Sequence, residues 1–289
     1  MRGDLAGGDQ VDAVGDTPHG SQFVRNEDAG DAKRLVQRLD ELQDLVQRDP
    51  QNTDWQHYLA VATNAVGIVL EAQSLPKAAA DEFRAGLDIL DKLARRDPAN
   101  ATWQRELGRT RFRLGHALLA SDQERQAGLE LQQAVVILEG IVRSDQTNAG
   151  WRRDLAEAVA VQGEVQLAVG GIEAAASDAE RALRLTDESL AQSADDRDAS
   201  RIGALALLLK ADVFSKRGNR AETDKSCRLA FSRLEPLVSR SSDYRVLVPW
   251  ARALACVGRR GEAQTVVERL DAMGYRSAPL TRSMALRER

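Results

Sequence analysis

Two glutamates on one face of a predicted helix, Glu157 and Glu164, have the spacing in this chain that best suits acid–base chemistry. They lie seven residues apart, which is two helical turns, and carboxylates placed in this way can mimic a general acid and a general base. Solvated helices often carry such pairs. We therefore interpret both glutamates as surface charges rather than as a catalytic pair.

Metal and phosphate chemistry find less support in the sequence. The three histidines, His19, His57 and His116, are scattered, and no cysteine or carboxylate stands near them at metal-ligand spacing. Neither GxGxxG nor a P-loop motif occurs, and the HRD and DFG signatures of protein kinases do not occur either. The RGD at residues 2–4 needs no explanation beyond chance. We predict that the chain is not an enzyme and uses no metal or cofactor.

The composition indicates a soluble helical protein. Of the 289 residues, 43% are apolar and 29% charged, whereas aromatic residues make up only 4%, and abundant Ala and Leu favour helix over sheet. The net charge of −4, without clustered Lys and Arg, argues against a nucleic-acid partner. No apolar run is long enough to cross a membrane, and the start lacks an apolar signal core, so we expect a cytoplasmic protein. Cys227 and Cys256 are interpreted as small buried apolar residues rather than as a disulfide.

A short phrase returns at a fixed interval along the chain and defines a repeat. Five kinds of residue recur at a spacing of 48 in three copies. They are Trp55, Trp103 and Trp151; Leu59, Leu107 and Leu155; Gly67, Gly115 and Gly163; Asp49, Asp97 and Asp145; and Asn52, Asn100 and Asn148. A period of this length is typical of a solenoid, in which each unit buries its apolar face only against its neighbours.

Each unit divides into two amphipathic helices with apolar residues three and four positions apart. Asp-Pro at 49–50 and 97–98 is expected to end the second helix, because the residue before proline avoids the helical region. Thr53 and Thr102 are then expected to cap the next helix, and Gln56 to complete a capping box with Thr53. We interpret the tryptophans as wedges between units, and the glycines as points of close approach between two helix backbones.

The pattern resembles the tetratricopeptide repeat (TPR). With the glycine of the family's first helix placed on Gly67, its next small residue falls on Ala79 and its aromatic position on Phe83. The period exceeds the family's usual 34 residues, so the resemblance is to a variant with longer helices. It implies an all-α fold, a right-handed α-solenoid of about four to five antiparallel helix pairs.

The resemblance also implies that the first helix of each pair lines a concave groove. The matching residues are Asn64, Ile68, Arg109, Phe112, His116, Glu157, Glu164, Asp212 and Lys216. Some TPR proteins hold a carboxylate with Lys and Asn at such places, but Phe112, Ala160 and Leu208 stand there in this chain. A peptide with an acidic or apolar start and a basic end would suit the mixed surface. The alternative is an ordinary solvated inner wall.

The repeats divide the chain into three parts. Residues 1–29 are expected to be a disordered Gly- and Asp-rich leader, 30–274 the repeat array, and 275–289 a basic tail. The expected units lie near 30–50, 51–98, 99–146, 147–194, 195–241 and 242–274. Because 31–48 matches a second helix without a first, the array is expected to begin in mid-repeat, either covered by another segment or as the tail of a longer protein.

Two functions fit this organisation. The first is a non-catalytic scaffold that binds a protein or peptide in an open concave trough. The second is a regulatory or sensory segment of a larger bacterial signalling protein, a serine/threonine kinase or transcriptional regulator, whose active part lies outside this chain. The sequence identifies neither the partner nor the oligomeric state.

Overall fold

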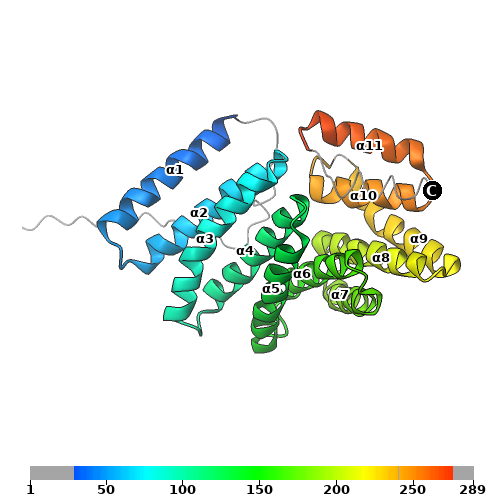
Figure 1. Cartoon of the computed structure of the whole chain (residues 1–289), viewed down its shortest axis with the longest axis horizontal. Coiled ribbons are helices and arrows are strands. Elements are labelled where there is room, and N and C mark those ends of the chain that lie inside the picture. Colours follow the sequence, from blue (N-terminus) through cyan, green and yellow to red (C-terminus); the bar gives the residue numbers. More distant parts are fainter. Residues whose placement is uncertain (1–28, 240, 276–289) are drawn as a thin grey trace, which may run out of the picture.

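The computed structural model of the chain describes residues 29–239 and 241–275, and all the regular secondary structure in this part is helical (Figure 1). Successive helices run antiparallel, and each packs against the next along the chain. The helices are α1 (Ala29–Arg48), α2 (Thr53–Ala72), α3 (Pro76–Arg96), α4 (Ala101–Ala120), α5 (Glu124–Ser144), α6 (Ala149–Ala168), α7 (Ile172–Gln192), α8 (Arg197–Lys216), α9 (Arg220–Val238), α10 (Tyr244–Cys256) and α11 (Arg260–Ala272). The predicted all-α solenoid is confirmed.

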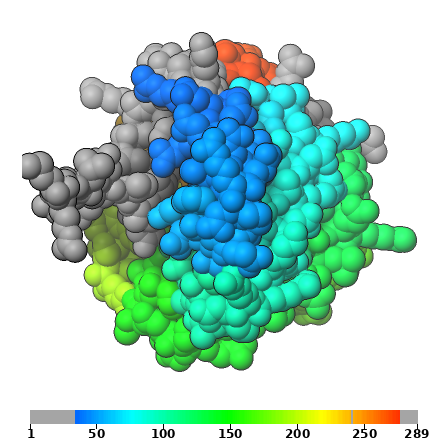
Figure 2. Space-filling view, turned by 90° about the vertical axis from the view of Figure 1, so that its left-hand side faces the viewer, coloured from blue at the N-terminus to red at the C-terminus, as the bar shows by residue number. Residues whose placement is uncertain are grey.

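The helices form two rows. The even-numbered helices also contact one another, α2 with α4, α4 with α6, α6 with α8 and α8 with α10, and they form the inner row. The odd-numbered helices from α3 to α11 alternate with them along the outer side. Helix α1 packs on α2 and forms the surface at one end of the array, seen in blue in Figure 2. The predicted leader and basic tail lie outside the described residues, apart from their residues next to α1 and α11.

The recurring asparagines start the inner helices. The side-chain oxygen of Asn52 accepts a hydrogen bond from the backbone N–H of Trp55 at 3.1 Å, and Asn100 and Asn148 do the same for the other two tryptophans. These are N-caps, which satisfy donors that a helix leaves unpaired in its first turn. In the fourth pair Asp196 takes the same role.

The expected threonine caps are therefore wrong. Thr53 is already the first residue of α2 and Thr102 the second residue of α4. Gln56 forms no capping box, because its side-chain amide donates instead to the carbonyl of Pro50 at 2.5 Å. Asn52, one residue before Thr53, and Asn100, two residues before Thr102, have the side chain and the extended backbone that a cap requires.

The recurring aspartates organise the turns before these caps. The carboxylate of Asp49 accepts the N–H of the residue two positions further on, and Asp97 and Asp145 repeat this contact. Such Asx turns reverse the chain locally without long-range contacts. The third copy has Gln146 where the other two have proline, yet it forms the same turn, so the carboxylate matters more than the proline.

Apolar clusters fill the space between the rows. The side chains of Phe83, Leu131 and Leu138 are fully buried, each on an outer helix facing inward. Trp103 and Trp151 are half-buried and pack against these clusters from the start of α4 and α6. The fourth pair has Ala199 and Ala211 in the tryptophan and glycine columns, and both are buried.

The repeat glycines make room mainly for side chains, which corrects our interpretation in part, because only at Gly115 would a Cβ also lie tightly, at 3.2 Å, against a backbone carbonyl, that of Ala127. A Cβ added at Gly67 would lie 2.6 Å from the ring of Phe83, and one at Gly163 would lie 2.5 Å from Leu209. The first contact is made within a helix pair, and the second with the following pair. A glycine costs roughly 1 kcal/mol in a helix interior, and here the packing of a large buried side chain offsets that cost.

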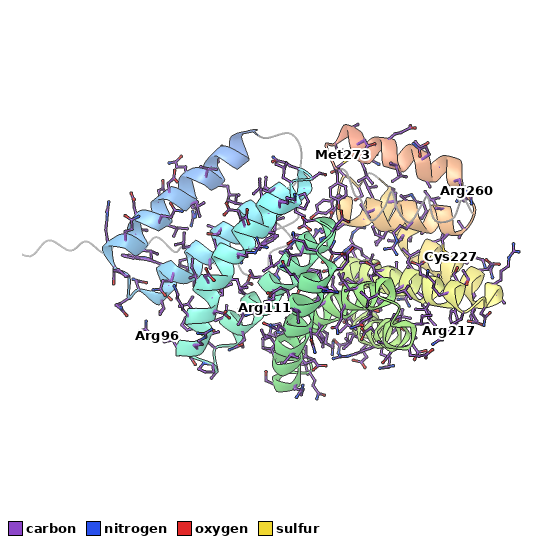
Figure 3. The ribbon with its side chains drawn as sticks, viewed as in Figure 1. Arg96, Arg111, Arg217, Cys227, Arg260 and Met273 are labelled. Carbon is purple, nitrogen blue, oxygen red and sulfur yellow. A yellow bond between two sulfur atoms is a disulfide. The ribbon has the colours of Figure 1, made fainter. Side chains whose placement is uncertain are left out.

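The two cysteines are joined, which also corrects our interpretation. Cys227 of α9 and Cys256 at the end of α10 form a disulfide with their Cα atoms 5.4 Å apart, a separation that disulfides commonly span (Figure 3 labels Cys227). The sequence could not reveal this, because 29 residues separate the cysteines and only the packing of α10 on α9 brings them together. The bond fastens the last helix pair to the fourth.

Breaking the disulfide should loosen the last helix pair. Closing a loop of this length contributes about 2–4 kcal/mol by restricting the unfolded chain. The double variant Cys227→Ala/Cys256→Ala should therefore unfold at a lower denaturant concentration than the wild type. Adding dithiothreitol should shift the wild type toward the variant and leave the variant unchanged. An equal shift of both proteins would contradict the assignment.

Two glycines should respond in opposite directions to the same substitution. Gly67→Ala forces the Phe83 ring to move and should destabilise the chain by about 1–3 kcal/mol. Gly128→Ala, on α5, meets only Val165 at an ordinary 3.6 Å and should stabilise it by about 1 kcal/mol. Chemical denaturation of both variants measures the difference. Stabilisation by Gly67→Ala equal to that by Gly128→Ala would show that Phe83 does not require the glycine.

Candidate binding surface

The inner row brings together charged side chains that are far apart in the sequence. We name the following set the inner ion network: Glu71 from α2, Arg113 and His116 from α4, Glu157 and Glu164 from α6, Arg201 and Asp212 from α8, and Arg252 from α10. Four carboxylates face three arginines and one histidine. The set is therefore electrically neutral when the histidine is protonated and carries one negative charge when it is not.

Glu71 is the most buried acid of this network. Its side chain is 7% exposed, one oxygen is hydrogen-bonded to Nδ1 of His116, and the other lies 3.6 Å from a guanidinium nitrogen of Arg113. Burial alone would raise the pKa of Glu71, but the charge and hydrogen bond of His116, together with the charge of Arg113, lower it below its usual value. Burial would lower the pKa of His116, but Glu71 outweighs burial and raises it.

Glu157 is held one helix further along by Arg201. A guanidinium N–H of Arg201 donates to the carboxylate at 2.7 Å, and the arginine side chain is 5% exposed. Burial would raise the pKa of Glu157, but the charge and hydrogen bond of Arg201 lower it to about 2. Arg245 adds a smaller electrostatic contribution from α10, where it forms a two-pronged hydrogen bond with Asp243.

Arg252 joins three helices of the inner row. It donates to Glu164 of α6 at 2.5 Å and to Asp212 of α8 at 3.2 Å. Burial would lower its pKa, but the two carboxylates raise it. Glu164 and Asp212 share this single arginine. Because the guanidinium holds both carboxylates, it fixes the spacing of α6, α8 and α10.

One of the predicted groove residues lies inside the packing instead of lining the groove. Asn64 is buried and donates a hydrogen bond to the hydroxyl of Thr110 at 2.7 Å, which ties α2 to α4. Ile68 is half-buried and packs against the first apolar cluster. Lys216 is exposed in the last turn of α8.

The patch predicted around Arg109, Phe112 and His116 is partly exposed to solvent and partly packed into the core. The Arg109 side chain is 36% exposed and lies 3.3 Å from Glu106 and 3.9 Å from Asp154. Phe112 is half-buried, packs into two apolar clusters, and its ring lies 6.3 Å from the His116 ring. Only the outer parts of this patch are available to a ligand.

The arginines that pair with the predicted acids were missed from the sequence. Arg113, Arg201 and Arg252 were not among the expected groove residues, yet they neutralise Glu71, Glu157 and the pair on α6 and α8. One signal could have found them. Most of the partners are separated by 40 to 45 residues, close to one repeat, and Arg252 and Glu164 by 88, close to two. Opposite charges about one or two repeats apart on inner helices are therefore expected to meet.

A similar link holds the outer row in place. Arg111 of α4, labelled near the middle of Figure 3, bridges Asp91 of α3 at 3.1 Å and Glu130 of α5 at 2.8 Å. Arg181 of α7 pairs with Glu139 of α5. The outer helices α3, α5 and α7 are thus joined by charges as well as by their apolar stripes.

The trough is closed along part of one rim. Ala72, at the end of α2, packs against the cluster of Tyr244, Leu247 and Leu270 from the last helix pair. Residues from nearly opposite ends of the array are therefore in contact, and in Figure 1 the upper end of α2 and α3 lies beside α11. The expected open trough is wrong at this rim.

The described residues hold neither a candidate metal centre nor a candidate membrane span. No group of three or more His, Cys, Asp or Glu side chains there could hold a metal ion. None of the helices there has both the length and the apolar character that a membrane crossing needs.

The pair of Glu71 and His116 should make stability depend on pH. The folded-state pKa of His116 lies above its usual value of 6.5, so its contribution is complete below about pH 6.5 and is lost as pH rises through the folded-state pKa. The melting-temperature advantage of the wild type over His116→Asn should therefore shrink between about pH 6 and pH 9.

His57 provides the matched control for this measurement. Burial lowers its pKa, so its unfavourable protonation occurs at low pH, and the difference between the wild type and His57→Asn should not shrink as pH rises. A constant difference for His116→Asn over this range would contradict the proposed charge state of the pair.

Comparison with known proteins gives a fold and no closer relationship. BtubC (BKLC) from P. vanneervenii superposes with a TM-score of 0.52 at 13% sequence identity, over 84% of this chain and 89% of that one. A tetratricopeptide repeat protein from Parabacteroides merdae ATCC 43184 gives 0.41 at 10% identity, over 94% and 100%. No family model matches the chain, and no curated protein matches its sequence. The similarity to BtubC shows that this helical repeat fold occurs in a solved structure whose sequence is only 13% identical.

Proposed function

We propose that this chain is a non-catalytic scaffold that binds a protein or peptide segment along its inner row of helices. The observation that carries the proposal is the continuous row of ordered, partly exposed charges on α4, α6 and α8. The side chains of Arg109, His116 and Asp212 are each about one-third exposed while held in ion pairs. Charges fixed in this way can recognise a partner without first being ordered.

The pairing of these charges restricts the partner. Glu157, Glu164 and Asp212 already have arginine partners, so they do not form the uncompensated acidic wall that a strongly basic peptide would require. A partner segment that carries both positive and negative side chains can instead replace an ion pair within this chain by an ion pair with the partner at each position along the inner row. This favours a polar or amphipathic segment of mixed charge over the acidic-to-basic peptide expected from the sequence.

The scaffold has the arrangement expected for such binding. A stack of helix pairs presents one long inner surface, and its geometry is set by contacts between neighbours. Arg252, Arg201 and Arg111 each join helices of successive pairs, so the spacing of the inner row is fixed by several links. Tetratricopeptide-type solenoids commonly present such a surface to other proteins, and the resemblance seen in the sequence supports the same role here.

Charge reversal on the inner row should reduce partner capture. The variant Arg109→Glu/Lys216→Glu changes two side chains that are partly or fully exposed, and it leaves Phe112 intact because that ring packs into the core. Affinity capture from the source organism, followed by quantification of the same captured proteins, should show at least a tenfold loss, which corresponds to about 1.4 kcal/mol.

The control for this experiment is Arg84→Glu on α3. Arg84 is exposed on the outer row, where it pairs with Asp81 of its own helix. Capture by this variant should equal that of the wild type, and circular dichroism should show unchanged helicity in both variants. Retained capture by the inner-row variant, or loss with Arg84→Glu, would exclude the inner row as the binding face.

A further inference from the structure

The outer face of α5 carries an uncharged strip that includes two exposed aliphatic side chains. Its members are Leu129, Gln132, Gln133, Val136 and Gly140, which we name the α5 strip. Leu129 is 60% exposed and Val136 is 61% exposed, and the two lie seven residues apart on the same face of the helix. Because both aliphatic side chains are mostly exposed, they gain little of the hydrophobic free energy that burial would give them.

The repeat itself shows that the fold does not need this strip. The equivalent positions, 48 residues earlier on α3, hold Asp81, Arg84, Ala85, Asp88 and Lys92. The equivalent positions 48 residues later on α7 hold Ser177, Glu180, Arg181, Arg184 and Glu188. The neighbouring helices form the same packing with mostly charged residues at these places. The loss of charge is therefore specific to α5.

Gly140 is a second, independent sign of close approach. A Cβ built at this residue meets nothing within 4 Å, in contrast to Gly67 and Gly163, where buried side chains require the space. A glycine inside a helix costs roughly 1 kcal/mol relative to alanine, and nothing in the described part of the chain compensates for it. A second helix lying across α5 would use the space that the missing side chain leaves.

The α5 strip reads nearly the same in both directions. From its centre, between Gln132 and Gln133, one aliphatic residue follows on each side, Leu129 and Val136. Two copies of α5 that cross antiparallel about a twofold axis at this centre place Leu129 against the partner's Val136, and Gln132 beside the partner's Gln133. Arg125 then lies opposite the partner's Gly140, where no side chain obstructs it. A twofold interface requires this kind of self-complementarity.

We propose that the α5 strip is covered by α5 of a second copy of this chain, in an antiparallel twofold dimer. The strip carries no charge, so the pairing brings no like charges together at its centre. Helix α5 has 21 residues and is about 32 Å long, so one helix pair buries less than the roughly 1,200–2,000 Å² of a stable interface. The dimer is therefore weak and depends on concentration.

Sedimentation velocity of the full chain tests the proposal. Over roughly 1 to 300 µM the wild type should shift from monomer to dimer. The variant Leu129→Asp/Val136→Arg introduces the residues that α3 and α7 carry at these positions, and it should weaken dimerisation at least tenfold with unchanged helicity and melting temperature. A wild type that stays monomeric over this range, or a dimer that persists in the variant, would overturn the proposal.

Engineered cysteines test the geometry of the pairing. The chain has two cysteines, and both are in the disulfide, so a new thiol is easily distinguished. Gln132→Cys lies next to the proposed axis and should form a covalent dimer on mild oxidation. Arg125→Cys lies about 11 Å from the axis along the helix, which separates the two copies by about 22 Å and should prevent the bond. Efficient cross-linking through residue 125, or none through 132, would exclude the antiparallel arrangement.

Discussion

Each helix of this chain can bury its apolar stripe only between helices of its own pair and the next, and the rest of the structure depends on that constraint. Phe83, Leu131 and Leu138 are fully buried because helices from two pairs enclose them. No pair has a separate core to rely on. The angle and spacing of successive pairs must therefore be fixed at the turns and along the rows, and polar residues carry out this task.

Polar residues fix the spacing in two ways. Asn52 and its equivalents set where each inner helix begins, because the cap and the preceding aspartate turn define the chain path within a few residues. Arg201 and Arg252 then set the separation of inner helices through paired, largely desolvated charges. A buried arginine without its carboxylate would carry a large penalty, so alternative alignments of the helices are disfavoured more strongly than apolar contacts alone would achieve.

The sequence predicted the fold well because the repeat reports on local features. The Asp and Asn columns mark turns and helix starts through contacts two or three residues away, whereas the Gly column marks close packing against side chains of other helices. The predicted cap was displaced by one residue, since both Thr53 and Asn52 are good capping residues and the sequence alone does not choose between them. A periodic pattern predicts the structure well where the interacting residues stand close together in the sequence.

The candidate surface was harder to predict because the contacts that shape it join residues far apart in the sequence. Glu157, Glu164 and Asp212 were placed on the inner helices, but their arginine partners come from neighbouring inner helices, and Asn64 turns into the packing through Thr110. The disulfide and the contact of Ala72 with the last pair escaped for the same reason. None of these depends on the repeat period alone.

The meeting of Ala72 with the Tyr244 cluster changes how this array can come apart. An open stack of helix pairs behaves as a one-dimensional chain of units, and it frays from either end because a terminal unit has one neighbour to lose. Here the last pair is fastened to α9 by a covalent bond and also rests on the end of α2. Fraying of this pair must therefore break its contact with α2 as well as its packing on α9, while the disulfide keeps it tethered.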